Sequence, residues 1–248
     1  METKLNYKRT FLIGLAFLSI CSFWQMYDNI IPLILQNTYH LGETMTGAVM
    51  ALDNVLAIFL LPVFGTLSDK VHTKLGRRMP FIVSGTILAV IFMMLLPMID
   101  NAEKARWGTV ESFSNQVIFL AVLFFTLVSM GLYRSPAVAL MPDVTPNHLR
   151  SRANAVINLM GAVGGVYALI MIKVLVGKGE TPDYLPLFAS IAAVMAIAVG
   201  ILVMTIRENK LREEVEKAEA ANAGTIEEKA MAEGVEAAGE IEAVGDTG

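Results

Sequence analysis

The sequence predicts an all-α membrane protein, and two observations lead to this fold class. Hydrophobic residues make up 55% of the 248-residue chain and charged residues only 17%, whereas about a quarter of the residues in soluble domains are charged. Apolar runs of about 20 residues, the length that crosses a bilayer as a helix, recur as far as Ile206. These runs are about twice as long as a barrel strand, so helices are predicted.

Six candidate spans follow one another along the chain. The first comes after basic residues, as in a signal peptide, but its apolar run is longer than a signal peptide needs, so it is predicted to remain in the membrane. The predicted ranges are Phe11–Leu35, Thr46–Leu67, Phe81–Ile99, Val117–Met141, Ala155–Val176 and Tyr184–Ile206.

Basic residues at the ends of the spans predict the orientation of the protein. Lys and Arg gather before the first span, between the second and third, between the fourth and fifth, and after the sixth. All four places lie on one side of the membrane, and positive residues favour the cytoplasmic side. We therefore expect a multi-pass protein of the cell (plasma) membrane with both termini in the cytoplasm.

The composition also predicts a division of the chain into two parts and excludes several classes of function. Residues 1–212 are predicted to form one transmembrane domain, and residues 213–248 an acidic, largely disordered cytoplasmic tail or linker between two halves. The basic residues are explained by topology, so no nucleic-acid partner is expected. The single cysteine, Cys21, excludes an intrachain disulfide and a Cys-rich metal site. No catalytic motif is present, so we expect neither an enzyme nor a bound metal or cofactor.

A densely charged loop joins the second and third spans. The stretch "GTLSDKVHTKLGRRMPF", residues 65–81, has the pattern G-x-x-S-D-x(6)-G-R-R-x-P-F. A loop that only sets topology needs Lys and Arg, but it does not need Gly65, Asp69 or Pro80 at fixed positions. The pattern resembles the signature of the major facilitator superfamily, in the form found in sucrose transporter-like proteins. The stretch "YRSPAVALMPDVTPNHLRSRANAVINLMGAVGG", residues 133–165, is similar to the fourth-to-fifth helix region of that group and of glycoside-pentoside-hexuronide cation symporters.

The resemblance implies a fold and a function. Six helices form half of such a transporter, as two inverted three-helix repeats, and the substrate lies between two halves. This chain would be the N-terminal half, paired with a missing C-terminal half or with a second copy of itself. The implied function is symport of a disaccharide or glycoside with a proton by alternating access. The alternative is a non-transporting six-helix protein, either a truncated product or an assembly partner, that needs a second half for activity.

The resemblance also implies a cytoplasmic gate. Arg77 and Arg78 can reach acids such as Asp143 at the end of the fourth span, and such a cluster would open and close as the halves rock. The alternative is an ordinary basic loop with one acid. The candidate gate residues are Gly65, Ser68, Asp69, Gly76, Arg77, Arg78, Asp143, Arg150 and Arg152.

Ionisable residues within the spans are candidates for ion coupling, because a charge in lipid is unfavourable. Asp28 lies in the first span and Arg134 in the fourth, and the resemblance implies that these helices line the cavity and carry a coupling pair. The alternatives are a structural salt bridge, or an Asp28 near the outer interface. Sodium-coupled relatives have paired carboxylates where this chain has Ala57 and Leu61, so the proton is favoured as coupling ion.

Side chains near Asp28 have the chemistry that binds sugars, because aromatic rings stack on sugar C–H faces and amides bind hydroxyl groups. Two of the candidates can instead have a purely structural role. Trp24 can anchor the membrane interface, and Asn158 can form a hydrogen bond between helices. The substrate-binding candidates are Trp24, Gln25, Tyr27, Asn29, Asp53, Asn54 and Asn158.

Overall fold

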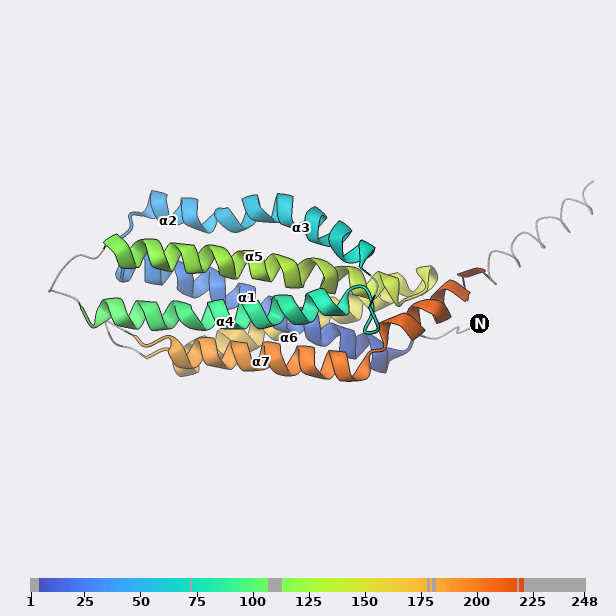
Figure 1. The fold of residues 1–248 in the computed structure, drawn as a ribbon. Coiled ribbons are helices and arrows are strands. Elements are labelled where there is room, and N and C mark those ends of the chain that lie inside the picture. Colours follow the sequence, from blue (N-terminus) through green and yellow to red (C-terminus); the bar gives the residue numbers. More distant parts are fainter. Residues whose placement is uncertain are drawn as a thin grey trace, which may run out of the picture.

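The computed structural model describes residues 5–71, 73–106, 113–177, 179, 182–217 and 219–220. Figure 1 shows a bundle of long helices that lie side by side. The helices are α1 (Tyr7–Asn37), α2 (Glu43–Met50), α3 (Leu52–Lys70), α4 (Met79–Lys104), α5 (Phe113–Asp143), α6 (Arg150–Leu175) and α7 (Leu185–Thr205), with a short 3-10 helix at Asn147–Leu149. Within the described part of the chain, six helices are long and apolar enough to cross a membrane, with α2 and α3 forming one of them. The six predicted spans are confirmed.

The first four observed spans extend beyond the predicted ranges and α6 starts earlier than predicted, whereas α7 is one residue shorter at each end. The helix α1 begins at Tyr7 because the side chain of Asn6 accepts a hydrogen bond from the Arg9 backbone N–H (3.2 Å), a typical N-cap. Pro80 lies in the first turn of α4, where its missing N–H leaves no helical hydrogen bond unmade. The second span is interrupted at Ala51, where neither proline nor glycine predicts a break.

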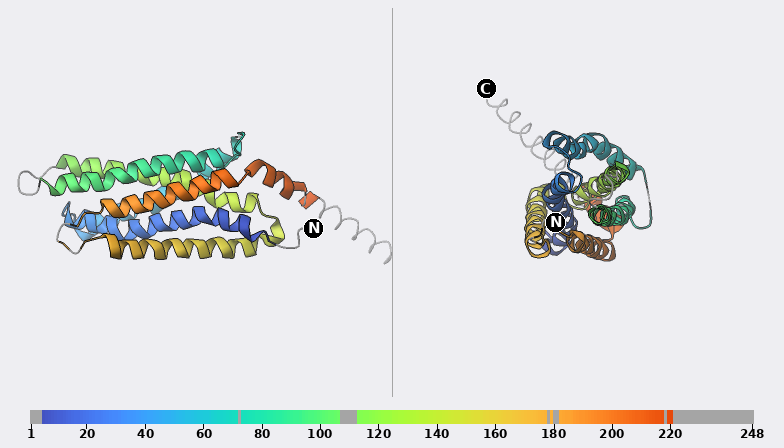
Figure 2. Two further views of the ribbon diagram at one scale, coloured as in Figure 1. Left: turned by 90° about the horizontal axis from the view of Figure 1, so that it is seen from below. Right: turned by 90° about the vertical axis from the view of Figure 1, so that its left-hand side faces the viewer.

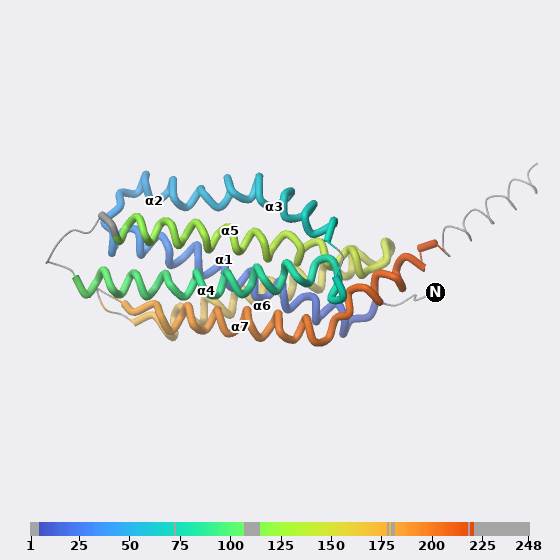
Figure 3. Tube along the Cα trace, viewed as in Figure 1, coloured from blue at the N-terminus to red at the C-terminus, as the bar shows by residue number. Residues whose placement is uncertain are grey.

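The packing of the spans follows an inverted repeat. The helix α1 packs against α6 and α7, whereas α5, three spans later, packs against α3 and α4. The first, second and third spans (α1, α2–α3 and α4) correspond to the fourth, fifth and sixth (α5, α6 and α7). The contacts of α1 with α6 and α7 therefore correspond to the contacts of α5 with α3 and α4. Because α1 starts at the end of the bundle where α5 finishes, the two three-helix units run in opposite directions (Figure 3). This is the arrangement predicted from the sequence.

Glycines allow the closest helix crossings. A Cβ atom at Gly164 of α6 would collide with the backbone of Leu18 in α1, and one at Gly85 of α4 would lie 2.6 Å from the Tyr133 backbone nitrogen in α5. At the first crossing, the Ser22 hydroxyl donates a hydrogen bond to the Gly164 carbonyl (2.9 Å). Small residues of this kind let membrane helices approach closely, so both crossings depend on the absence of a side chain.

The loops divide between two ends of the bundle. We call the end that holds residues 71, 73–78, 144–149 and 206–217 the basic end, and the opposite end, with residues 38–42 and 182–184, the outer end. The N-terminal turn of α1 also lies at the basic end (Figure 1). After α7, residues 206–207 interrupt the helix, and residues 208–217 form a further helix that continues at an angle (Figure 2).

Candidate functional site

Aromatic and charged side chains meet near the middle of the bundle, on α1, α3 and α5. The guanidinium carbon of Arg134 lies 5.5 Å from the centre of the Trp24 ring, which is cation–π distance. The Trp24 ring packs edge to face on Tyr27, with the ring centres 5.4 Å apart. Asp53 of α3 interacts electrostatically with both Tyr27 and Asp28. We call Trp24, Tyr27, Asp28, Asp53 and Arg134 the central cluster.

Two polar atoms of the central cluster are buried without a partner. The indole nitrogen of Trp24 and the hydroxyl of Tyr27 make no hydrogen bond within the described residues. A small cavity of about 20 Å³ is lined by Trp24, Asp53 and Arg134 together with apolar side chains of α3 and α5. That volume holds about one water molecule, so this cavity is too small for a sugar.

The predicted coupling residues lie on neighbouring helices but do not form an ion pair with each other. Among the described residues, neither Asp28 nor Arg134 has a salt bridge. Asp28 is exposed on α1, whereas Arg134 is half-buried against Trp24. Sequence reasoning paired the arginine with the acid on α1 and gave Asp53 a weaker role, but the structure places Asp53 on the same cavity as Arg134.

Of the other substrate-binding candidates, Asn29 and Asn54 form side-chain hydrogen bonds, whereas no such bond is observed for the side chains of Gln25 and Asn158 among the described residues. The amide of Asn29 donates to the Gln25 carbonyl (2.7 Å), and the amide of Asn54 donates to the Asp53 carboxylate (2.9 Å). Gln25 is half-buried beside Gly165 of α6. Asn158 is exposed on α6 and makes no hydrogen bond in the described part of the chain. The helix-to-helix hydrogen bond that was the alternative for Asn158 is not observed among the described residues.

At the basic end, Arg78 joins three helices. Its side chain is 7% exposed. The guanidinium binds Asp143 of α5 (Nε to Oδ2, 3.0 Å) and Asp69 of α3 (Nη2 to Oδ1, 2.7 Å), and it donates to the Ser68 hydroxyl (2.6 Å) and the Gly65 carbonyl (3.3 Å). Arginine suits this task because its planar group presents several donors in fixed directions. The four contacts connect the ends of α3 and α5 to the start of α4.

The remaining gate candidates have smaller roles or none in the described structure. Arg77 lies 3.7 Å from Asp143. Arg150 donates to the carbonyls of Pro142 (2.9 Å) and Thr145 (3.2 Å), and so completes hydrogen bonds at the end of α5. Arg152 is exposed and forms no ion pair with any described residue.

Glu208 contacts the predicted gate region and was not among the candidates chosen from the sequence. It lies just after α7, is 1% exposed, and its carboxylate accepts hydrogen bonds from the backbone N–H groups of Arg77 (2.8 Å), Arg78 (3.0 Å) and Met79 (3.1 Å). These are free donors at the start of α4. Gly76 has φ +127°, and a Cβ there would collide with the Glu208 carboxylate. An acid directly after the last span, among basic residues, was the available signal.

A second missed cluster lies at the outer end. Asp100 of α4 is fully buried, accepts a hydrogen bond from the Thr38 hydroxyl (2.6 Å) and pairs with Lys104 (2.6 Å). The Lys104 ammonium also lies 4.5 Å from the centre of the Tyr184 ring. Burial, followed by the nearby charge of Asp100, raises the pKa of the Tyr184 phenol, so the ring stays neutral. This cluster connects the ends of α1 and α4 to the start of α7.

Comparison with known proteins gives these clusters a family context. The model of the Major Facilitator Superfamily matches residues 12–237. Sucrose transport protein SUT3 of Oryza sativa subsp. japonica is 26% identical over 137 residues, 52% of this chain and 27% of that protein. Sucrose transport protein SUC4 of Arabidopsis thaliana is 34% identical over 116 residues, 44% of this chain and 22% of that protein.

A bacterial relative shows the same partial coverage. An uncharacterized symporter of Synechocystis sp. is 24% identical over 144 residues, 56% of this chain and 25% of that protein. The chain thus spans about a quarter of the length of the curated relatives it matches.

Proposed function

Because the chain belongs to the major facilitator superfamily, we propose that it is the N-terminal six-helix half of a secondary active sugar transporter. The observation that carries this proposal is the similarity to sucrose transport proteins, which covers about half of the chain. The substrate class is a disaccharide or related glycoside. In this proposal the basic end faces the cytoplasm of a plasma-membrane protein, because the basic residues at the ends of the spans gather there.

The central cluster is the proposed sugar-binding surface of this half. The Trp24 indole and the Tyr27 hydroxyl are buried hydrogen-bond groups without partners among the described residues, and such groups gain free energy when a ligand satisfies them. Trp24 also offers an aromatic face, although Arg134 now lies over its ring. Since the cavity beside it holds about one water molecule, the full site requires a second six-helix half.

The proton is the proposed coupling ion. Asp28 and Asp53 are carboxylates within the first and second spans, and ionisable side chains inside membrane spans are typical of proton pathways. The positions where sodium-coupled relatives have paired carboxylates are Ala57 and Leu61, two apolar residues on the wall of the small cavity. That wall offers no oxygen ligands for Na⁺ at those two positions.

The Arg78 contacts are the proposed cytoplasmic gate. Arg78, Asp69 and Asp143 join α3, α4 and α5 at the basic end, and Glu208 fixes the start of α4. Alternating access requires contacts that form on one side of the membrane and break when the other side closes. Polar contacts between helix ends meet this requirement, because the separated groups are hydrated when they part.

Uptake of labelled disaccharides into proteoliposomes that contain this chain alone tests the proposal. Uptake driven by an inward proton gradient and abolished by a protonophore would show that two copies form a complete transporter. Failure of the folded chain to take up sugar, followed by uptake when a C-terminal half is co-expressed, would support a half that needs a different partner. No uptake in either assembly would contradict sugar transport and favour a non-transporting six-helix protein.

A further inference from the structure

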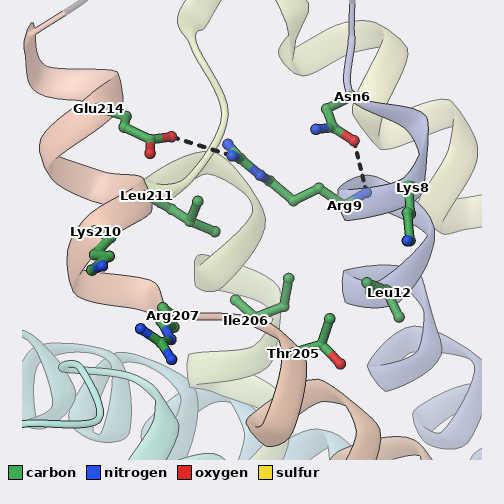
Figure 4. A pocket seen from close by; sticks show the side chains of 10 residues that line it. All are labelled: Asn6, Lys8, Arg9, Leu12, Thr205, Ile206, Arg207, Lys210, Leu211 and Glu214. Atoms are coloured by element: carbon green, nitrogen blue, oxygen red, sulfur yellow. Dashed lines mark hydrogen bonds and ion pairs between the residues drawn. The ribbon is translucent and has the colours of Figure 1, made fainter.

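A cavity of about 290 Å³ opens at the basic end (Figure 4), and its lining includes no residue of the central cluster and none of Arg78, Asp69, Asp143 and Glu208. It lies between the first turns of α1 and the helix of residues 208–217. The volume is close to the lower end of the range for small-ligand pockets, about 300 Å³. One ion pair, from Arg9 to Glu214 (3.2 Å), reaches from one wall to the other (Figure 4). The cavity therefore has two walls whose spacing a salt bridge helps to set.

The cavity is strongly cationic. Four basic side chains line it, Lys8 and Arg9 from α1 and Arg207 and Lys210 from the segment after α7, against one acid, Glu214. Arg9 already pairs with that acid. Lys8, Arg207 and Lys210 are exposed and form no ion pair with any residue that the structure describes. The lining thus holds one such basic side chain on the α1 wall and two on the opposite wall (Figure 4).

The position of two of these cations strengthens the positive potential. Lys8 and Arg9 lie in the first turn of α1, a helix of 31 residues with no acid in that turn. The N-terminus of a helix carries a partial positive charge and favours anions. Lys8 and Arg9 repel this partial positive charge. A bound anion would be attracted both to the N-terminus of α1 and to the two basic side chains.

The cavity also has an apolar part. Leu12 and Leu211 are half-buried in its wall, and Ile206 is 5% exposed. The candidate spans Tyr7–Asn37 and Leu185–Thr205 end beside it. The cavity therefore lies where the hydrocarbon region of a membrane meets its headgroups, with charges and apolar side chains in one place. Basic pockets in that position favour phosphate-bearing lipid headgroups.

We propose that this cavity binds a phosphate group, held by Lys8, Arg207 and Lys210, and that an anionic lipid headgroup supplies it. Phosphatidylglycerol carries the required single negative charge on a phosphate, with acyl chains that extend into the bilayer next to Leu12. A soluble phosphate compound shares the headgroup chemistry but has no acyl chains. The two sources differ in whether the apolar wall contributes to binding.

Native mass spectrometry of the purified full chain, released from detergent micelles, measures this binding directly. The ligands are short-chain phosphatidylglycerol, phosphatidylcholine with the same chains, and inorganic phosphate. The test variant carries Lys8→Gln, Arg207→Gln and Lys210→Gln. The matched control carries Lys74→Gln, Arg152→Gln and Lys217→Gln, which remove three exposed cations of the basic end outside the cavity. The single variant Lys8→Gln changes one exposed side chain and serves if the triple variant does not fold.

We expect phosphatidylglycerol to bind tightly and phosphatidylcholine weakly, with about tenfold or greater loss of phosphatidylglycerol affinity in the test variant. The control variant should retain its affinity, and Lys8→Gln alone should lose a few-fold. Equal loss in test and control variants would overturn the site, as would equal binding of the two lipids. Inorganic phosphate that binds as tightly as phosphatidylglycerol would keep the anion site but overturn its assignment to a lipid.

Discussion

Replacing Glu208 with glutamine tests whether the helix after α7 stabilises the start of α4, where the proposed gate lies. The carboxylate is buried and accepts hydrogen bonds from three backbone N–H groups at the start of α4. A hydrogen bond to a charged group contributes about 1.5–3 kcal/mol, and one between neutral groups about 0.5–1.5 kcal/mol. Glutamine keeps one acceptor oxygen, whose bonds are each weaker by about 1 kcal/mol without the charge. Its NH₂ group replaces the other oxygen and cannot accept, so the N–H of either Arg77 or Met79 loses its partner.

Two further effects adjust that sum in opposite directions. The negative charge at the N-terminus of α4 contributes about 0.3–1 kcal/mol that glutamine loses, whereas a neutral side chain is easier to bury. We expect Glu208→Gln to lower the free energy of unfolding by about 2–3 kcal/mol. Unfolding in mixed micelles with increasing SDS, followed by circular dichroism, measures the change. The control is Glu213→Gln, which alters an exposed residue of the same helix. Equal stability of the two variants would refute the reasoning.

Three other substitutions test the contacts between helices in the same unfolding assay. Arg78→Met removes the partner of two carboxylates and should destabilise the protein by about 3 kcal/mol, whereas Arg152→Met should have little effect; similar values would remove Arg78 from its central place. Gly76→Ala should lower stability by about 1–3 kcal/mol because φ there is +127°, and an unchanged midpoint would contradict that conformation. Gly164→Ala should destabilise by about 1–3 kcal/mol through collision with α1, unlike Gly200→Ala, whose new Cβ meets nothing within 4 Å; equal effects would argue against the close crossing.

Local signals in the sequence account for the parts that could be predicted. Each span is a continuous apolar run, and lipid requires that its backbone groups bond within the helix, so the number and type of the spans follow from composition. The ion pairs of Arg78 with Asp69 and Asp143 could be anticipated because a loop between two antiparallel helices places these residues at one end. The inverted repeat came from family resemblance and not from periodicity.

The parts that could not be predicted depend on contacts between distant segments. Glu208 is 130 residues from Arg78 in the chain, and nothing near either residue indicates the distance between them. Arg134 packs on the Trp24 ring and forms no ion pair with Asp28, since rotamers and helix rotation decide between an aromatic and an acidic partner. The buried pair of Asp100 and Lys104 lies at the end of a span, and its burial depends on contacts with α1 and α7 that no local pattern indicates.

The measurement that tests the proposed mechanism most directly compares proton-driven accumulation with counterflow of labelled sucrose, in proteoliposomes of a transport-competent assembly. Counterflow needs sugar binding and alternating access, whereas accumulation also needs the proton. The wild-type chain should support both processes. Asp28→Asn should abolish accumulation and retain counterflow, because the asparagine side chain cannot carry the proton. Undiminished accumulation by Asp28→Asn would contradict a coupling role for Asp28, and absence of both processes in the folded wild-type assembly would contradict sucrose transport.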